Sequence, residues 1–199
     1  MARIDGVTRE QGDPLTKITY RMAERGYGRV PEPLTIFAHH KKLMLGYCGL
    51  EQALELSKRI PEKYKALGEI KAAAMSGCEF CLDIGSWVAQ NNGVSERQLQ
   101  ELHRYRESDA FDDTEKAVLA YAEGMTRTPV EVPQELFDDL RGRFGEAELV
   151  ELTASIATEN FRSRFNHAFD CGPQGYSEGA YCIRPEAEAL ATDGAAVES

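Results

Sequence analysis

Residues 62–87 read EKYKALGEIKAAAMSGCEFCLDIGSW, and this stretch predicts two helices that meet beside a pair of cysteines. A proline stands just before the alanine-rich run, a position where proline favours the start of a helix. Gly77 follows the run and is the residue type that most often ends a helix. The second helix is predicted to begin at Cys78 and to end near Asn91, so Cys78 and Cys81 share one face of its first turn.

Helix signals continue on both sides of this stretch, whereas strand signals are nearly absent. Ser95 with Gln98 and Asp112 with Glu115 each form the capping-box pattern that opens a helix. Further helices are expected over about 14–25, over 34–57 (divided into two), over 133–145 and over 146–170. We therefore predict an all-α chain of about eight helices, with a single domain over residues 1–184. Residues 185–199 have little to bury, so a disordered tail is predicted there.

The charge of the chain excludes several classes of partner. Its 33 acidic and 23 basic residues give a net charge of −10, and both nucleic acids and anionic membranes need a positive surface. No apolar run reaches the ~18 residues of a membrane-spanning helix. The N-terminal stretch MARIDGVTREQGDP contains no apolar signal core. We expect a cytoplasmic protein with neither a nucleic-acid nor a membrane partner.

The cysteine pair admits three interpretations. A thiol reacts with a peroxide or a disulfide as its thiolate, and the start of a helix lowers the thiol pKa from about 8.5 because free N–H groups stabilise the negative charge. A structural zinc site needs a second pair of ligands, and neither Cys171 with Cys182 nor His39 with His40 has suitable spacing. Two inert buried cysteines are the third interpretation. We favour a redox pair, and we predict no metal and no other cofactor.

Four stretches of the chain resemble one known family. SGCEFCLD at 76–83, behind its alanine-rich helix, is similar to the cysteine motif of the carboxymuconolactone decarboxylase and alkylhydroperoxidase D-like superfamily. VPEPLTIFAH at 30–39, AVLAYAEGMT at 117–126 and ELVELTASIATENFRSRFN at 148–166 are similar to other parts of the same pattern. The resemblance covers roughly residues 30–170. It implies an alkylhydroperoxidase D-like helical bundle that assembles as a homotrimer or hexamer, a small hydroperoxide as substrate and an external dithiol as reductant. It also implies that Cys81 is the peroxidatic cysteine and Cys78 the resolving one.

Two positions depart from the pattern of that family. The relay histidine of the family lies four residues after the second cysteine, where this chain has Gly85. The relay glutamate lies twelve residues before the first cysteine, where this chain has Ala66. A base must lie within hydrogen-bond reach of the thiol, directly or through water. Glu69, almost one turn after Ala66, is the predicted substitute, and His39 or His40 is the alternative base.

These features make a thiol-dependent peroxide or disulfide oxidoreductase the first hypothesis of function. One alternative is a carboxymuconolactone decarboxylase-like enzyme that acts on a small carboxylic acid or lactone through a histidine base. The other is a non-enzymatic helical oligomer whose cysteines sense the redox state. Two smaller expectations concern neighbouring positions: Asp83 should be exposed, and Arg162 and Arg164 should pair with acidic residues in the core or at an interface.

Overall fold

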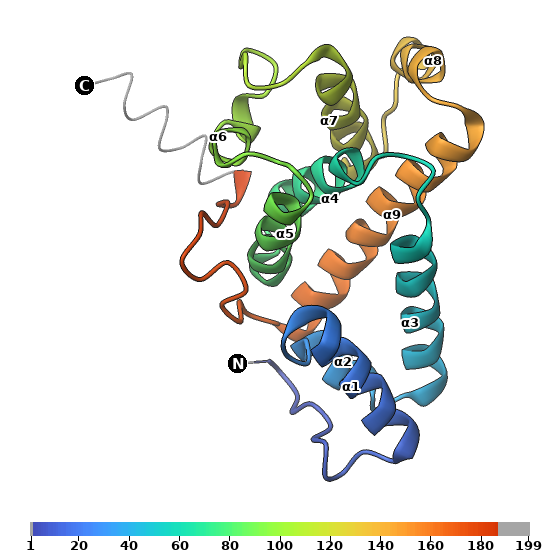
Figure 1. The fold of residues 1–199 in the computed structure, drawn as a ribbon, viewed down its shortest axis with the longest axis vertical. Helices are drawn as coiled ribbons and strands as arrows, with labels where there is room; N and C mark the ends of the chain where they lie inside the picture. Colours follow the sequence, from blue (N-terminus) through green and yellow to red (C-terminus); the bar gives the residue numbers. More distant parts are fainter. Residues whose placement is uncertain (1, 187–199) are drawn as a thin grey trace.

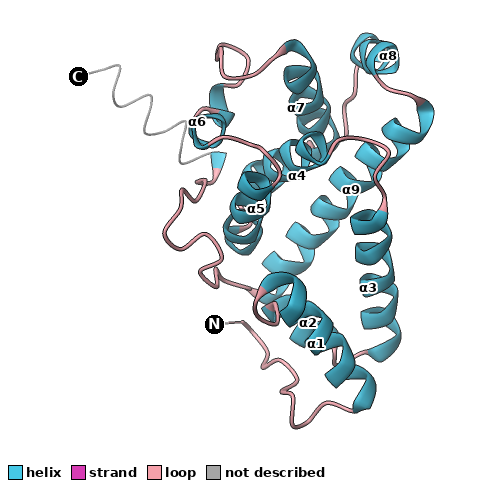
Figure 2. Cartoon of the chain, in the orientation of Figure 1, coloured by secondary structure: helices cyan, strands magenta, loops and turns pink. Residues whose placement is uncertain are grey.

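The computed structural model describes residues 2–186, and these fold into nine α-helices and one short 3₁₀ turn, with no strand among them (Figures 1 and 2). The helices are α1 (Pro14–Tyr27), α2 (Glu32–Phe37), α3 (Lys41–Leu56), α4 (Glu62–Ser76), α5 (Glu79–Asn91), α6 (Glu96–Gln100), α7 (Asp113–Thr126), α8 (Gln134–Arg143) and α9 (Glu146–Phe169). The predicted all-α class is confirmed, with nine helices where about eight were expected. The predicted disordered tail lies largely in 187–199, outside the described residues.

The predicted helix boundaries around the cysteine pair are confirmed. Gly77 ends α4 in the left-handed conformation, with φ 67° and ψ 26°, a backbone region that glycine enters without steric cost. Cys78 is the N-cap residue of α5. The two predicted capping boxes are also present, at the start of α6 and at the start of α7. Local sequence therefore sets the junction at which the pair lies.

Helix α4 occupies the centre of the main core and packs against α5, α7 and α9 (Figure 1). Leu67 and Ile70 of α4, with Leu152 and Ile156 of α9, are almost fully buried in this core. Gly68 lets the two helices approach closely, because a Cβ atom there would lie 2.8 Å from Cγ1 of Ile156. The close packing fixes the position of α9 relative to the helix that leads into the cysteine pair.

The N-terminal helices form a second, smaller core. It contains Tyr20, Leu34, Phe37, Ala38 and Met44. Helix α3 contributes Met44, its one fully buried residue, and the partly buried Tyr47 and Cys48 to this core. Several leucines of α3 are exposed instead, namely Leu43, Leu45, Leu50 and Leu56.

Residues 171–186, which we call the strap, follow α9 and run back along α5 (Figure 1). The strap makes hydrogen bonds along the length of α5, from Asp83 through Ser86 to Gln90. Its end reaches the α4–α5 junction, where a Cβ atom on Gly77 would lie 3.9 Å from Cβ of Pro185. Within residues 2–186, no helix combines the length and the apolar character that crossing a membrane requires.

Candidate functional site

Cys78 and Cys81 form a disulfide at the start of α5, with their Cα atoms 5.2 Å apart. Both residues are buried, at 2% and 4% exposed. The backbone N–H of Cys81 donates to Sγ of Cys78 over 3.2 Å, which is the N-cap contact of the helix. One N–H group of the first turn therefore contacts Cys78 directly, whereas Cys81 lies one turn further along.

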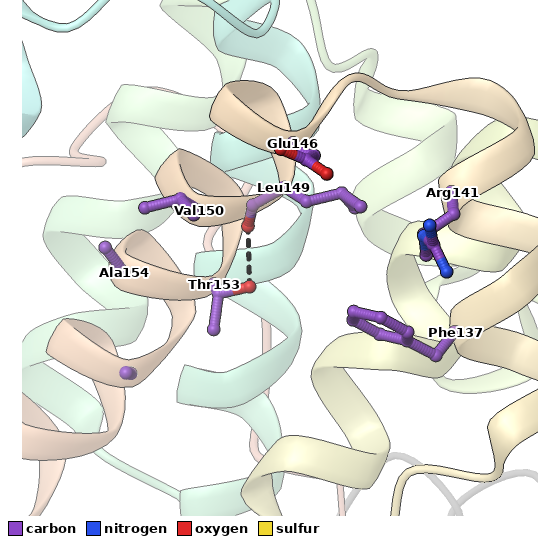
Figure 3. Close-up of a pocket in the computed structure, with 8 residues that line it drawn as sticks. Phe137, Arg141, Glu146, Leu149, Val150, Thr153 and Ala154 are labelled. Atoms are coloured by element: carbon purple, nitrogen blue, oxygen red, sulfur yellow. Dashed lines mark hydrogen bonds between the residues drawn. The ribbon is translucent and has the colours of Figure 1, made fainter.

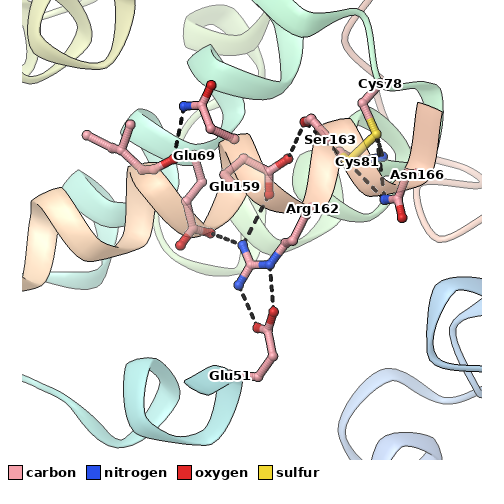
Figure 4. Close-up of polar contacts among 10 residues, drawn as sticks. Glu51, Glu69, Cys78, Cys81, Glu159, Arg162, Ser163 and Asn166 are labelled. Carbon is pink, nitrogen blue, oxygen red and sulfur yellow. Dashed lines mark hydrogen bonds and ion pairs between the residues drawn. A yellow bond between two sulfur atoms is a disulfide. The ribbon is translucent and has the colours of Figure 1, made fainter. Parts of the chain in front are cut away.

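Two buried side chains of α9 face the disulfide (Figure 4). The side-chain amide of Asn166 donates to Sγ of Cys81 over 3.3 Å and lies 3.7 Å from Sγ of Cys78. The hydroxyl oxygen of Ser163 lies 3.6 Å from Sγ of Cys81. Because Ser163 and Asn166 are three residues apart on one helix, both point to the same side. Cys81 therefore has polar neighbours from another helix in addition to its own.

A chain of polar contacts leads from Cys81 along α9 (Figure 4). The hydroxyl of Ser163 donates to Oε1 of Glu159 over 3.0 Å, and Oε2 of Glu159 accepts from Nη1 of Arg162 over 3.1 Å. Arg162 also binds Glu51 of α3 in a two-point contact of 2.7 and 2.5 Å. Its Nη1 lies 3.7 Å from Oε2 of Glu69 on α4. We call Glu51, Glu69, Glu159 and Arg162 the acidic cluster.

The acidic cluster places three carboxyl groups around one guanidinium, and this excess of negative charge alters their titration. Burial, and then the neighbouring Glu159 and Glu51, raise the pKa of Glu69 to about 7 against the pull of Arg162. Burial also raises the pKa of Glu159. For Arg162, burial alone would lower the pKa, but the carboxylates keep it well above its ordinary value. Near neutral pH the cluster thus holds a carboxyl group that can give or take a proton.

The predicted base residues have partners other than the cysteine sulfurs. Glu69 is connected to the pair through Arg162, Glu159 and Ser163. Nε2 of His39 lies 2.8 Å from the backbone oxygen of Asp5, and Nδ1 of His40 accepts from the backbone N–H of Leu43 at the start of α3. The catalytic roles of Glu69, His39 and His40 stay predictions.

Gly85 stands where the family usually has its relay histidine. It lies on α5 against α4, where an added Cβ atom would come within 3.0 Å of Cδ1 of Ile70. That separation is tighter than an ordinary carbon–carbon contact, so a larger side chain would require the end of the Ile70 side chain to shift. The polar groups beside the disulfide come from α9 instead.

Sequence reasoning missed Glu159, Ser163 and Asn166, although it placed Arg162 correctly against acidic residues. A signal for the missed residues exists in α9. Its buried face runs through Leu152 and Ile156, and the same spacing continues through Glu159, Ser163 and Asn166. A change from apolar to polar residues along one buried face is informative, because buried polar side chains need partners.

Asp83 was expected to be exposed, and this expectation is wrong: the residue is 2% exposed beneath the strap. Its carboxylate accepts backbone N–H groups of Gln174, Tyr176 and Ser177 over 2.8, 3.1 and 2.9 Å, and the hydroxyl of Ser177 over 2.7 Å. Burial pushes the pKa of Asp83 upward, but these hydrogen bonds outweigh it and hold the pKa below its ordinary value. Asp83 therefore fastens the strap to α5.

A separate apolar groove of about 530 Å³ lies between α8 and the first half of α9 (Figure 3). It is lined by Phe137, Arg141, Glu146, Leu149, Val150, Thr153, Ala154 and Ala157. Thr153 and Ser163 are ten residues apart on α9, which corresponds to roughly 15 Å along the helix axis. The groove is therefore distinct from the disulfide site.

Comparison with known proteins places the chain among relatives of mostly unassigned function. Residues 41–124 match the model of the Carboxymuconolactone decarboxylase family. The uncharacterized protein YnjA of Escherichia coli is 39% identical over 112 residues, 56% of this chain and 61% of that protein. The uncharacterized protein YdfG of Bacillus subtilis is 32% identical over 52% of this chain and 71% of its own length. The chain thus spans less than two thirds of the E. coli relative.

Solved structures with a similar fold cover nearly the whole chain. An alkylhydroperoxidase AhpD core, an uncharacterized peroxidase-related protein from Ralstonia eutropha, has a TM-score of 0.79 at 15% identity, covering 91% of this chain and 97% of its own. A variant of the debrominase Bmp8 in complex with 2,3,4-tribromopyrrole has a TM-score of 0.78 at 22% identity, covering 96% of both chains. At these identities the likeness establishes the fold.

Proposed function

The chain belongs to the carboxymuconolactone decarboxylase family and has an alkylhydroperoxidase D-like fold, and we propose that it is a thiol-dependent oxidoreductase that reduces a small hydroperoxide. The observation that carries the proposal is the Cys78–Cys81 disulfide, buried against Ser163 and Asn166 and connected through Ser163 to a carboxyl group of raised pKa. A pair held only for packing would not require polar partners.

The reaction begins from the reduced pair. The Cys81 thiolate attacks the terminal oxygen of the hydroperoxide, an S–O bond forms, the O–O bond breaks, and the departing alkoxide takes a proton to become an alcohol. The Cys78 thiolate then attacks the sulfur of the sulfenic acid. An S–S bond forms, and the hydroxyl group leaves as water after taking a second proton. Two thiols and one hydroperoxide thus give a disulfide, an alcohol and water.

The proton of Cys81 leaves through Ser163. The hydroxyl oxygen of Ser163 accepts it from the thiol while the hydroxyl proton passes to Glu159, 3.0 Å away. A raised pKa makes Glu159 a stronger base than an ordinary carboxylate. Glu69, the base predicted from sequence, acts one step further back: it shares Arg162 with Glu159, and its protonation changes the charge around that base. His39 and His40 remain the alternative bases.

Regeneration needs an external dithiol, which opens the disulfide through a mixed disulfide and leaves with its own two sulfurs joined. The reducing environment of the cytoplasm suits this cycle. The exposed leucines of α3 favour the homotrimer or hexamer implied by the family, because single helices rarely leave so many leucines in water. Assembly state is measured by light scattering, and a mass of about 22 kDa at micromolar protein would contradict it.

A second candidate is reductive debromination of a brominated aromatic compound, the class that the Bmp8 variant binds. The raised pKa of Glu159 favours it, because this carboxyl group is connected to the pair through Ser163 and can supply the proton that a ring carbon takes up. The Cys81 thiolate would take the bromine as the ring carbon takes up a proton, and the Cys78 thiolate would displace bromide to form the same disulfide. One aromatic bromide and two thiols would give a ring with hydrogen in place of that bromine, a disulfide, bromide and one proton. Offering each substrate separately to the reduced protein, and assaying alcohol or bromide, decides between the candidates.

The test of the proposed function uses the two single-cysteine variants and mass spectrometry after a pulse of tert-butyl hydroperoxide. Cys81→Ser should lose all peroxide-dependent sulfenic acid. Cys78→Ser should accumulate sulfenic acid on Cys81, because the resolving thiol is gone. Sulfenic acid that survives Cys81→Ser and vanishes in Cys78→Ser would reverse the roles. No oxidation in either variant, with a folded protein, would contradict the peroxidase.

A further inference from the structure

The two sulfurs of the pair differ in their nearest hydrogen-bond donor. Sγ of Cys78 accepts the backbone N–H of Cys81 at the start of α5 over 3.2 Å, and the Asn166 amide only over 3.7 Å. Sγ of Cys81 has the same Asn166 amide at 3.3 Å and the Ser163 hydroxyl at 3.6 Å, both from α9. The backbone is thus the nearest donor to Cys78, and the Asn166 side chain is the nearest donor to Cys81.

Ser163 is not available as a donor to a Cys81 thiolate. Its hydroxyl has one proton, and Oε1 of Glu159 is the nearer acceptor for it, at 3.0 Å against 3.6 Å for the sulfur. In the proposed proton path Ser163 accepts from Cys81 and passes a proton on. The Asn166 amide, which neither gains nor loses a proton near neutral pH, is then the side-chain donor that remains beside Sγ of Cys81.

A buried thiol without such a donor is present in the same protein. Cys171, at the base of the strap, is 7% exposed, and burial followed by Glu32 and Asp170 raises its pKa to about 11. Cys81 is buried to a similar degree, at 4% exposed. Burial would make Cys81 equally unreactive unless a donor compensates for the lost contact of its thiolate with water.

We propose that the Asn166 amide is a catalytic group that holds the negative charge of the Cys81 thiolate and so makes this buried cysteine nucleophilic. The inference rests on the proposed function of the pair. Charge-assisted hydrogen bonds are about twice as strong as neutral ones, so the amide favours the thiolate over both the thiol and the disulfide. Two residues then replace the relay histidine: Asn166 stabilises the negative charge of the thiolate, and Ser163 transfers the proton.

The experiment measures the thiol pKa of Cys81 in the Cys78→Ser background, from the pH dependence of its alkylation by iodoacetamide. Serine at position 78 keeps the N-cap, since serine is a favoured N-cap residue. Adding Asn166→Leu, which removes the donor at similar size, should raise the Cys81 pKa by at least about one unit, and so leave about tenfold less thiolate at neutral pH. Adding Asn166→Asp should raise it further, because a carboxylate repels the thiolate. This second variant retains a polar side chain if leucine disturbs folding.

Two controls separate a specific contact from a general disturbance of α9. Asn160→Leu alters an amide on the same helix that contacts Thr126 and Ile156, and it should leave the Cys81 pKa unchanged. In the Cys81→Ser background, Asn166→Leu should shift the Cys78 pKa much less than it shifts that of Cys81, because Cys78 keeps its backbone donor. A Cys81 pKa that moves by less than about 0.3 unit in both Asn166 variants would overturn the proposal, as would equal shifts for the two cysteines.

The outcome is separable from that of the proposed function. Alkylation reports thiolate formation with no peroxide present. If Asn166 sets the Cys81 pKa but peroxide fails to oxidise the wild-type pair, the peroxidase hypothesis falls and the assignment of Asn166 stands. If the wild-type protein reduces peroxide but changes at Asn166 leave the Cys81 pKa unaltered, the assignment of Asn166 falls and the peroxidase hypothesis stands.

Discussion

Helix α9 and the strap both hold α5, but they do so through different kinds of contact. The strap is fixed by backbone groups: Asp83 accepts three N–H groups within 3.1 Å, and Ser86 accepts another from Ile183. Helix α9 reaches the sulfurs through side chains, over 3.3 to 3.7 Å. Backbone contacts keep one geometry, whereas side-chain contacts to sulfur can adjust as the pair changes between disulfide and thiols. The strap therefore holds α5 in place, and α9 supplies the side chains that take part in the reaction of the pair.

Glu159→Gln, on the α9 side, should have the largest effect on the reaction of the pair. Glutamine keeps the shape of the side chain but cannot take the proton that Ser163 passes on. Disulfide formation after a peroxide pulse should slow by about 10²–10⁴-fold, the usual contribution of a positioned base. The rate can be followed by the fluorescence of Trp87, the single tryptophan, which lies on α5 with the pair.

The matched control for Glu159→Gln is Glu151→Gln. Glu151 lies on the same helix and is buried, but it pairs with Lys65 over 2.8 Å, away from the sulfurs. This variant should lose stability without a comparable loss of rate. Equal rates of disulfide formation in wild type and Glu159→Gln would contradict the proton path through Ser163 and Glu159.

On the strap side, Asp83→Ala should weaken the fold with little effect on the reaction of the reduced pair. The change leaves three backbone N–H groups and one hydroxyl without their acceptor. We expect the free energy of unfolding to fall by about 2–3 kcal/mol, measured by urea denaturation. Asp138→Ala, on the exposed face of α8, is the control and should change it by less than about 0.5 kcal/mol. If disulfide formation in Asp83→Ala slows as much as in Glu159→Gln, the strap and α9 do not act separately.

Glu69→Gln should have a smaller effect on rate than Glu159→Gln, because Glu69 contacts the proton path only through Arg162. We expect about a tenfold slower disulfide formation, at or below the low end of the range for general bases. His39→Gln and His40→Gln are run beside it and should react at the wild-type rate. If one histidine variant is slow and Glu69→Gln is not, the base is that histidine.

The two regions should also respond to pH in opposite directions. The folded-state pKa of Asp83 is lowered, so its stabilising effect is present above the ordinary carboxyl pKa and is lost on acidification. The folded-state pKa of Glu69 is raised from 4.5 to about 7, so the folded state loses stability as pH rises across that interval. Arg162, Glu159, Glu51 and Lys65 act on Glu69 there.

Glu69→Gln should therefore flatten the decline in stability between pH 4.5 and 7, by on the order of 1 kcal/mol after solvent screening. Asp83→Asn should leave that interval unchanged and flatten the decline at lower pH. Thermal unfolding across pH 3–8 checks both. A Glu69→Gln profile parallel to that of wild type would mean that Glu69 titrates normally.

Local sequence predicted the parts of this site that depend on neighbours in the chain. Gly77 ends one helix and Cys78 caps the next because both effects act within four residues. Asn166 and Ser163 escaped prediction because 85 and 82 residues separate them from Cys81, and only the packing of α9 on α4 brings them together. The error at Asp83 has the same origin, since the strap that buries it begins some 90 residues later.

Local opening of helix α3 should control the access of water to the acidic cluster. With Met44 as its one fully buried residue, α3 gains little apolar burial within a single chain, and its hold on α9 includes the pair of contacts between Glu51 and Arg162. Segments with few buried contacts open locally at a low free-energy cost, before the rest of the protein unfolds. Amide protons of α3 should therefore exchange with solvent earlier than those of α4. Each such opening would release Glu51 and admit water beside Arg162. The rate at which α3 opens would then limit the rate of proton exchange between the acidic cluster and bulk solvent.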